Sequence, residues 1–101
     1  MFNEFSIEQI AGDLIPQATY EQKLATAFLR NNGTTDEGGA FFEEYRVKYA
    51  VDRLSTVSSI WLGLTTGCAQ CHDHKYDPIS HKDFFEMYAF FNVAADAGRQ
   101  I

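Results

Sequence analysis

The sequence predicts an all-α fold of about four helices, with a Cys-x-x-Cys-His loop between the last two. Apolar residues recur at intervals of three and four along four separate stretches, which is the spacing of one helix face. Capping patterns precede three of these stretches, and no stretch alternates apolar and polar residues convincingly enough for a strand. The 101 residues suffice for one small domain, and 46% of them are apolar, which is enough for a core.

Two short helices are predicted in the first third of the chain. The first spans residues 6–14 behind a capping serine, Ser6, and ends before Pro16. The second begins after Thr19, which opens a second capping pattern, and stops at the Asn-Asn-Gly sequence of residues 31–33. We expect both apolar stripes to face a core, and neither helix carries obvious chemistry.

An acidic loop over residues 34–42 leads to the third helix. Its surroundings hold four carboxylates and no basic residue between positions 36 and 44, namely Asp36, Glu37, Glu43 and Glu44. Asp36 and Glu37 precede two glycines and are candidate contacts for a cation or a substrate. The alternative is a solvated loop with favourable negative charge at the start of the next helix.

The longest helix is expected over residues 43 to about 64. Arg46 and Arg53 are seven residues apart, so they share a face and could bind an anionic group through bidentate contacts. The alternative is a surface stripe with local partners, such as Glu43 three residues before Arg46. Serine and threonine pairs within residues 55–59 weaken the helix and could mark a bend.

The last helix is expected to begin at Ser80, because Pro78 prevents a helix before that residue. Ser80 forms a capping pattern with Asp83. The apolar face of this helix consists of Phe84, Met87, Tyr88 and Phe91.

The loop before this helix contains Cys-x-x-Cys-His, the attachment signature of a c-type haem, and it uses both cysteines of the chain. Cys68 and Cys71 are three residues apart, so their thiols can add to the two vinyl groups of one porphyrin. His72 can then place an imidazole nitrogen on the iron. The leading prediction is therefore a haem c site, with Arg46 and Arg53 as candidate partners of the haem propionates.

Three other interpretations of the cysteine pair stay open. Zinc could be bound by the two thiols together with His72, His74 or His81, because Cys-x-x-Cys is half of a common zinc ligand set. The thiols could form a disulfide, although the strand-rich context of a thioredoxin-like motif is missing. They could also remain an ordinary pair of reduced cysteines.

The motif does not specify the sixth ligand of a haem iron. Met87 and His81 are the two candidates by chain length, although a Met at helical spacing is more often part of a core. His74 follows His72 too closely to reach the opposite face of the ring, so a role in bonding the loop is favoured. A Met ligand would raise the reduction potential relative to a second His, and an open position would permit redox catalysis.

Charge and hydropathy narrow the classes of function. The formal net charge of −6 argues against nucleic-acid binding, and no run of 18 apolar residues predicts a membrane span. The first residues lack the basic and apolar regions of a signal peptide. Because haem c is attached outside the cytoplasmic membrane, we expect the chain to be a fragment of an exported protein, cut within a linker at residues 98–101.

Several blocks of this sequence carry a family resemblance. The most specific block, residues 67–79, reads Gly-Cys-Ala-Gln-Cys-His-Asp-His-Lys-Tyr-Asp-Pro-Ile, and shorter blocks lie at residues 8–14, 36–39, 44–46, 51–53 and 63–65. Together they resemble the family called domain of unknown function 1549. The resemblance implies that Cys68 and Cys71 are thioether positions and that His72 is the iron ligand. His74 and Asp77 match positions of the same block with no assigned role.

The resemblance also implies the setting of the chain. Residues 1–101 would be a single domain, the C-terminal portion of a larger one, in a periplasmic or secreted protein of planctomycetes and related bacteria. A separate cytochrome c-like domain commonly lies beside it, so the expected partner is that domain or another redox protein. The expected function is electron transfer. The alternatives are a catalytic portion of a secreted enzyme, with the acidic loop and the two arginines near a metal or haem, and a structural zinc domain.

Overall fold

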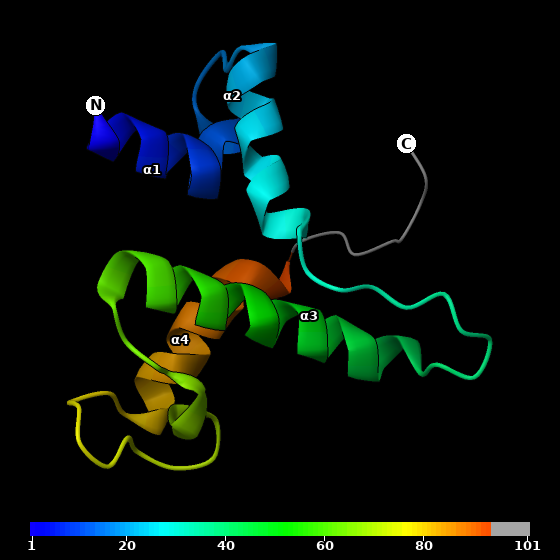
Figure 1. Ribbon diagram of the computed structural model, residues 1–101, viewed down its shortest axis with the longest axis vertical. Helices are drawn as coiled ribbons and strands as arrows, with labels where there is room; N and C mark the ends of the chain where they lie inside the picture. The colour runs from blue at the N-terminus through cyan, green and yellow to red at the C-terminus, as the bar shows by residue number, and fades with distance from the viewer. Residues whose placement is uncertain (94–101) are drawn as a thin grey trace. The chain divides into compact units, whose positions relative to one another are not determined.

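A computed structural model of the chain describes residues 1–93 (Figure 1). Within those residues there are four α-helices and no strand, which confirms the all-α prediction, and the cysteines lie in the loop between α3 and α4. The helices are α1 (Phe2–Ala11), α2 (Tyr20–Ala25), α3 (Phe42–Val57) and α4 (His81–Asn92). The predicted linker at residues 98–101 lies outside the described part of the chain.

The chain divides into two compact units. The first comprises residues 1–32 with α1 and α2, and the second starts at Gly33 and contains α3 and α4. The expectation that residues 1–101 form a single domain stays a prediction. No helix in the described residues is both long enough and apolar enough to cross a membrane.

The first helix begins four residues earlier than predicted. Ser6 therefore lies inside α1 and does not cap it, so that prediction was wrong. Its hydroxyl donates to the carbonyl oxygen of Phe2 at 2.8 Å, a bond that serines often make within helices. The α-helix tightens into a 3-10 turn, η1 (Gly12–Leu14), and Ile15 is extended because it precedes Pro16.

The second helix begins as predicted, behind a capping box of Thr19 and Gln22. The backbone N–H of Gln22 donates to the Thr19 hydroxyl at 3.3 Å, and the Thr19 backbone N–H donates to the Gln22 side chain at 2.9 Å. After α2 the chain continues as a 3-10 helix, η2 (Thr26–Arg30). Gly12 lies against α2 so closely that a Cβ atom there would be 2.1 Å from the carbonyl oxygen of Gln22. Only glycine permits this approach.

The third helix continues beyond its α-helical part. After Val57 it becomes a π-helical turn, η3 (Ser58–Leu62), at the serine pair where the sequence predicted a weak point. Gly63 ends it in the left-handed conformation with φ of 65°, which glycine adopts without strain. The predicted helix over residues 43–64 is therefore correct in extent to within two residues.

The second unit has a hydrophobic core between α3 and α4, which pack against each other. Its buried apolar side chains are Ala50, Leu54 and Val57 from α3, Phe84 and Phe91 from α4, and Ala69 from the loop between them. Phe84 and Leu54 are at most 1% exposed. Burial of each of these two side chains stabilises the fold by about 1.5–3 kcal/mol.

The fourth helix starts at the predicted capping box. The backbone N–H of Asp83 donates to the Ser80 hydroxyl at 3.1 Å, and the Ser80 backbone N–H donates to the Asp83 carboxylate at 2.8 Å. These bonds satisfy N–H groups that have no partner within the helix, and they set the position of the first turn of α4. The first residue of that turn, His81, makes hydrogen-bond contacts with the cysteine loop.

Candidate cysteine site

The two cysteines lie on a short 3-10 turn, η4 (Gly67–Gln70), which ends at Cys71. The backbone N–H of Cys71 donates to the carbonyl oxygen of Cys68 at 3.4 Å, so one turn separates the two residues. Side chains three residues apart eclipse each other in an ideal turn of this kind, which is the spacing that a two-thiol attachment requires. Both are free and exposed, whereas Ala69 between them is fully buried.

The imidazole of His72 is exposed beside this turn. Its Nδ1 atom lies 2.7 Å from the carbonyl oxygen of Asp73. Because a carbonyl can only accept, this contact places a ring proton on Nδ1, and in the neutral ring the lone pair then lies on Nε2. An imidazole in this tautomer can ligate a metal through Nε2.

His74 has a different environment and holds the following loop in shape. Its side chain is only 8% exposed, and its Nδ1 accepts hydrogen bonds from the backbone N–H groups of Tyr76 at 3.3 Å and Asp77 at 3.0 Å. Its own backbone N–H donates to the carbonyl oxygen of Ile79 at 2.8 Å. The Asp77 carboxylate lies 3.3 Å from the same ring nitrogen. His74 and Asp77 are thus neighbours within one loop.

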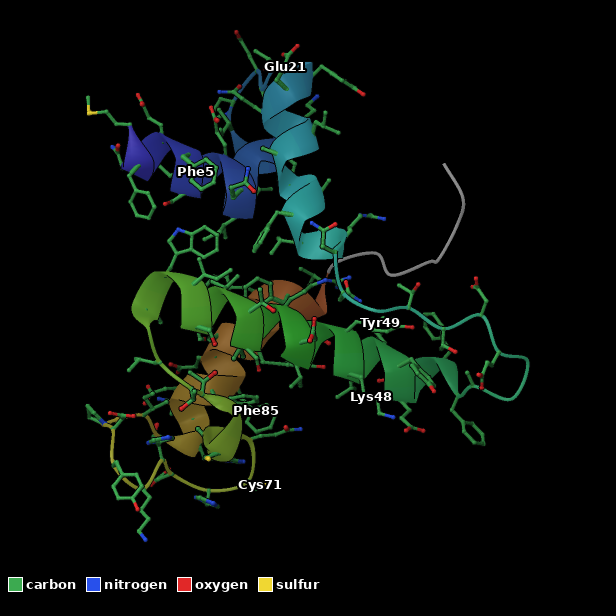
Figure 2. The ribbon with its side chains drawn as sticks, viewed as in Figure 1. Phe5, Glu21, Lys48, Tyr49, Cys71 and Phe85 are labelled. Atoms are coloured by element: carbon green, nitrogen blue, oxygen red, sulfur yellow. The ribbon has the colours of Figure 1, made fainter. Side chains whose placement is uncertain are left out.

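The first residue of α4 contacts the cysteine turn and also the residue that follows His72. The backbone N–H of His81 donates to the carboxylate of Asp73 at 2.7 Å, and the ring Nε2 lies 3.1 Å from the carbonyl oxygen of Gln70. The ring also packs edge-on against Phe85, with 4.8 Å between ring centroids. Phe85 on α4 and Cys71 in the loop are both labelled in Figure 2. His81 therefore lies at the cysteine site.

Met87 lies within the packing of α3 on α4. The hydroxyl of Ser58 donates to its sulfur at 3.6 Å, and the Met87 side chain is half-buried. The roles of Met87 and His81 as sixth ligands stay predictions.

The two arginines lie in different environments. Arg46 forms an ion pair with Glu43, as the alternative of a local partner predicted. Its guanidinium also donates to the side-chain oxygen of Asn92, at the end of α4, and to the carbonyl oxygen of the same residue at 3.4 Å. The hydrogen bond with Glu43 raises the pKa of Arg46 and lowers that of the carboxyl. Arg53 is only 6% exposed, so it does not belong to a solvated stripe.

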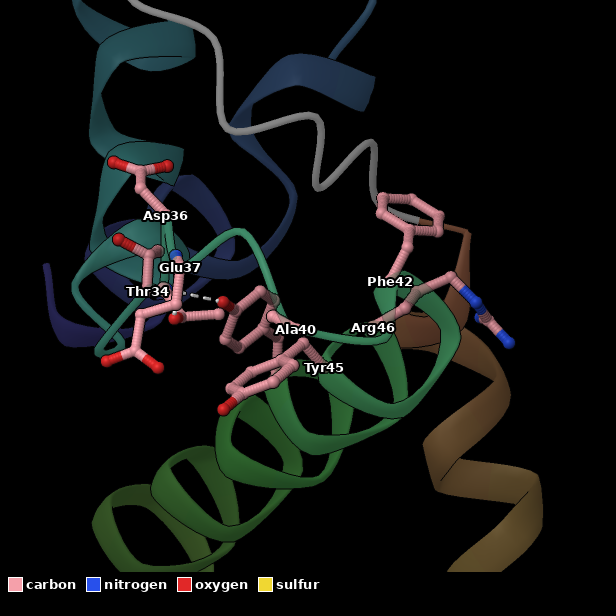
Figure 3. A pocket seen from close by; sticks show the side chains of 9 residues that line it. Thr34, Asp36, Glu37, Ala40, Phe42, Tyr45 and Arg46 are labelled. Carbon is pink, nitrogen blue, oxygen red and sulfur yellow. Dashed lines mark hydrogen bonds between the residues drawn. The ribbon is translucent and has the colours of Figure 1, made fainter.

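The acidic loop forms a pocket of about 260 Å³ with the first half of α3 (Figure 3). Asp36, Glu37 and the stem of Arg46 line it together with the aromatic rings of Tyr45 and Tyr49. Figure 3 shows the guanidinium of Arg46 pointing away from both carboxylates. This pocket has no lining residue from the cysteine turn, so the predicted grouping of the acidic loop with the cysteines gains no support from it.

Neither of the metal and disulfide alternatives gains support from the geometry. No group of three or more His, Cys, Asp or Glu side chains in residues 1–93 is arranged to hold a metal ion. The two thiols are not joined to each other. What remains at the site is a pair of accessible thiols on one turn, followed directly by an imidazole with an open Nε2.

The family model PSCyt2, described as a protein of unknown function (DUF1549), matches residues 1–96. The chain belongs to this family. The DUF1549 family model thus covers the first unit, most of the second unit and the whole cysteine loop, and its name associates the domain with cytochromes. No curated protein and no solved structure matches the chain.

Sequence reasoning missed one residue of the site, Asp73. It was part of the most specific block but had no chemical role, because its partner His81 lies eight residues away across a proline-containing loop. A usable signal existed. A carboxylate shortly before a helix can accept from the first free N–H groups of that helix, where the helix dipole also favours negative charge.

Proposed function

We propose that this DUF1549 chain is a haem c-carrying electron-transfer module of a larger exported protein. Cys68 and Cys71 would form the thioether bonds, and His72 would be the proximal ligand. The observation that carries the proposal is the geometry of the turn: two accessible thiols lie one turn apart, and the next residue is an imidazole whose Nδ1 is bonded, so that Nε2 is its remaining nitrogen. The association of the family name with cytochromes supports it.

The residues present fit this group chemically. Haem bound here would supply a one-electron redox centre. The chain contributes two thiols that no disulfide occupies and an imidazole whose orientation is set by the Asp73 carbonyl. Buried Ala69 holds the turn against the protein while the thiols face solvent, so the attached group would lie at the surface. A surface position favours electron exchange with a redox partner or an adjacent cytochrome c-like domain.

The proposal includes export. Thioether attachment of haem takes place outside the cytoplasmic membrane, so we propose a periplasmic or secreted location for the parent protein. The net charge of −6 would favour partners with a basic docking face, because complementary charge steers association.

The test is an absorption spectrum of the chain exported in a host that attaches haem c. After denaturation in alkaline pyridine and reduction, we expect the α-band of a haem with two thioether bonds. Replacing both Cys68 and Cys71 by Ala should abolish covalent haem, and replacing only one should shift the band to that of a single thioether. Lys75→Ala, an exposed change in the same loop, is the matched control and should leave the spectrum unchanged.

A colourless protein would contradict the proposal. If that protein carried one zinc ion per chain, and lost it in the double cysteine variant, a zinc site would replace the haem hypothesis. A colourless and metal-free protein would leave the cysteines as ordinary thiols.

A further inference from the structure

We propose that His81 and Asp73 are positioning residues that attach the haem-binding segment to the start of α4. The inference rests on the proposed function, since the segment in question is the one that would carry haem. It assigns a role to two residues that lie outside the Cys-x-x-Cys-His motif. It also gives His81 a role other than that of a sixth iron ligand.

The first argument is the placement of the contacts along the segment. His81 bonds Gln70, which lies between the two cysteines, and Asp73, which directly follows His72. The two contacts therefore bracket the second cysteine and the histidine. Because both contacts come from one residue, His81 ties the two ends of the bracketed segment to the same point at the start of α4.

The second argument is that His81 is itself held in place. It is the first residue of α4, directly after the capping serine, so its backbone position is fixed by the capping box. Its ring packs against Phe85, whose own ring packs edge-on against the buried Phe84 at 5.2 Å between centroids. The contacts thus connect the exposed cysteine turn to the core of the second unit.

The third argument links these contacts to the imidazole of His72. Asp73 uses both of its polar groups: its carboxylate accepts from the first N–H of α4, and its carbonyl oxygen accepts from Nδ1 of His72. When an imidazole ligates a metal, a hydrogen bond from its other ring nitrogen fixes the orientation of the ring and raises its basicity. If Asp73 lost its carboxylate, its backbone would no longer be held at the start of α4. Its carbonyl oxygen would then no longer fix the orientation and the basicity of the His72 imidazole.

The tautomer of His81 follows from the same bonding. The Gln70 carbonyl can only accept, so the ring donates from Nε2 and its Nδ1 carries the lone pair. A glutamine at this position keeps an N–H donor at a similar reach, whereas an alanine keeps none. Comparing His81→Gln with His81→Ala therefore tests whether the N–H donor of the side chain is what holds the segment.

The first measurement uses the full chain without haem, so that it does not depend on the proposed function. Amide hydrogen exchange at residues 70–73 should accelerate at least tenfold in His81→Ala and in Asp73→Ala, and should stay near wild type in His81→Gln. Nitrogen NMR of His72 should show loss of the single tautomer in Asp73→Ala. Lys82→Ala, at the next and exposed position of α4, is the matched control and should change neither signal.

The second measurement uses the haem-loaded chain. We expect Asp73→Ala and His81→Ala to shift the reduction equilibrium by about tenfold, which is about 59 mV for a one-electron couple. His81→Gln should restore the wild-type potential. Faster exchange at residues 70–73 with an unchanged potential would overturn the positioning role, because the contacts would then be purely structural.

Failure of the two proposals can be told apart. A wild-type chain that takes up no haem would contradict the electron-transfer function. The exchange and tautomer data would still decide whether His81 and Asp73 order residues 70–73. A wild-type chain that takes up haem, with variants that match it in exchange, tautomer and potential, would overturn the positioning inference and leave the function standing.

Discussion

The two units of this chain use the same local devices but differ in what holds them together. Each has a helix that starts at a Ser/Thr capping box, Thr19 with Gln22 in one and Ser80 with Asp83 in the other. In residues 1–32, however, Gly12 is the only buried residue, and large apolar side chains such as Phe2 and Leu14 are mostly exposed. Only the second unit contains fully buried large side chains.

The difference appears in the helices themselves. α3 runs for 16 residues and α4 for 12, whereas α2 has six residues and both helices of the first unit continue as 3-10 turns. Short helices are marginal unless tertiary packing supports them. The haem-binding segment lies in the better packed unit, where a site can be held rigidly. The comparison teaches that a capping box sets where α2 and α4 begin, and that packing against a neighbouring helix determines how far a helix continues.

The largest expected effect comes from the core of the second unit. Phe84→Ala would remove a ring that is 1% exposed and leave a cavity between α3 and α4. We expect a loss of about 3–5 kcal/mol in the free energy of unfolding, the usual cost of such a truncation. Denaturant unfolding followed by circular dichroism measures it.

The matched control for this change is Phe90→Ala on the same helix, where the ring is 78% exposed. It should cost less than about 0.5 kcal/mol, as exposed substitutions usually do. If the two variants were equally stable, the core described for α3 and α4 would not be what stabilises the second unit, and the contrast between the units would fail.

A smaller and local effect is expected at Gly12 in the first unit. An added Cβ would lie 2.1 Å from the backbone oxygen of Gln22, so Gly12→Ala forces α2 away from η1. We expect a cost of about 1–3 kcal/mol, the range for overpacked sites, confined to residues 1–32. Amide exchange resolved by residue measures it. Gly33→Ala is the control, because an added Cβ at Gly33 would meet no atom within 4 Å beyond its chain neighbours. Equal disturbance of α3 and α4 would show that the units unfold together.

The sequence predicted the helices better than their packing. Periodicity and capping located all four helices and the loop that carries the cysteines, because these signals are local. The sequence did not predict the early start of α1, because Ser6 resembled a capping residue, although no residue before it breaks a helix. The sequence did not predict the burial of Arg53, because a charged residue is usually expected on a solvated face.

The site was predictable to the extent that it is contiguous. Cys68, Cys71 and His72 were found because the motif is a single run of five residues. The contact of Arg46 with Asn92 spans 46 residues, and that of His81 with Asp73 crosses a proline loop, so no local pattern reports either. Grouping the acidic loop with the cysteines rested on charge, and the pocket beside the acidic loop has no lining residue from the cysteine turn, so that grouping stays a prediction.

The smallest expected effect distinguishes the two capping boxes by their charge. Hydrogen bonds from the hydroxyl and backbone N–H of Ser80 lower the pKa of Asp83 below its ordinary 3.8, whereas Gln22 at the equivalent place cannot ionise. A lowered pKa stabilises the folded state above pH 3.8, and this contribution disappears as the pH falls through the lower folded value. Acid should therefore loosen the start of α4 and leave the start of α2 unchanged.

Amide exchange at residues 81–84 and 20–23, followed from pH 6 to pH 2, measures this contrast. Asp83→Asn should already be loosened at neutral pH and should converge with the wild type in acid, because both then carry a neutral side chain. Gln22→Glu would give α2 an ionisable box and should make its first turn sensitive to acid as well. A wild-type α4 that keeps its protection through pH 2 would mean that the Ser80 hydroxyl alone sets the cap, and the charge of Asp83 would then play no part in holding the helix that carries His81.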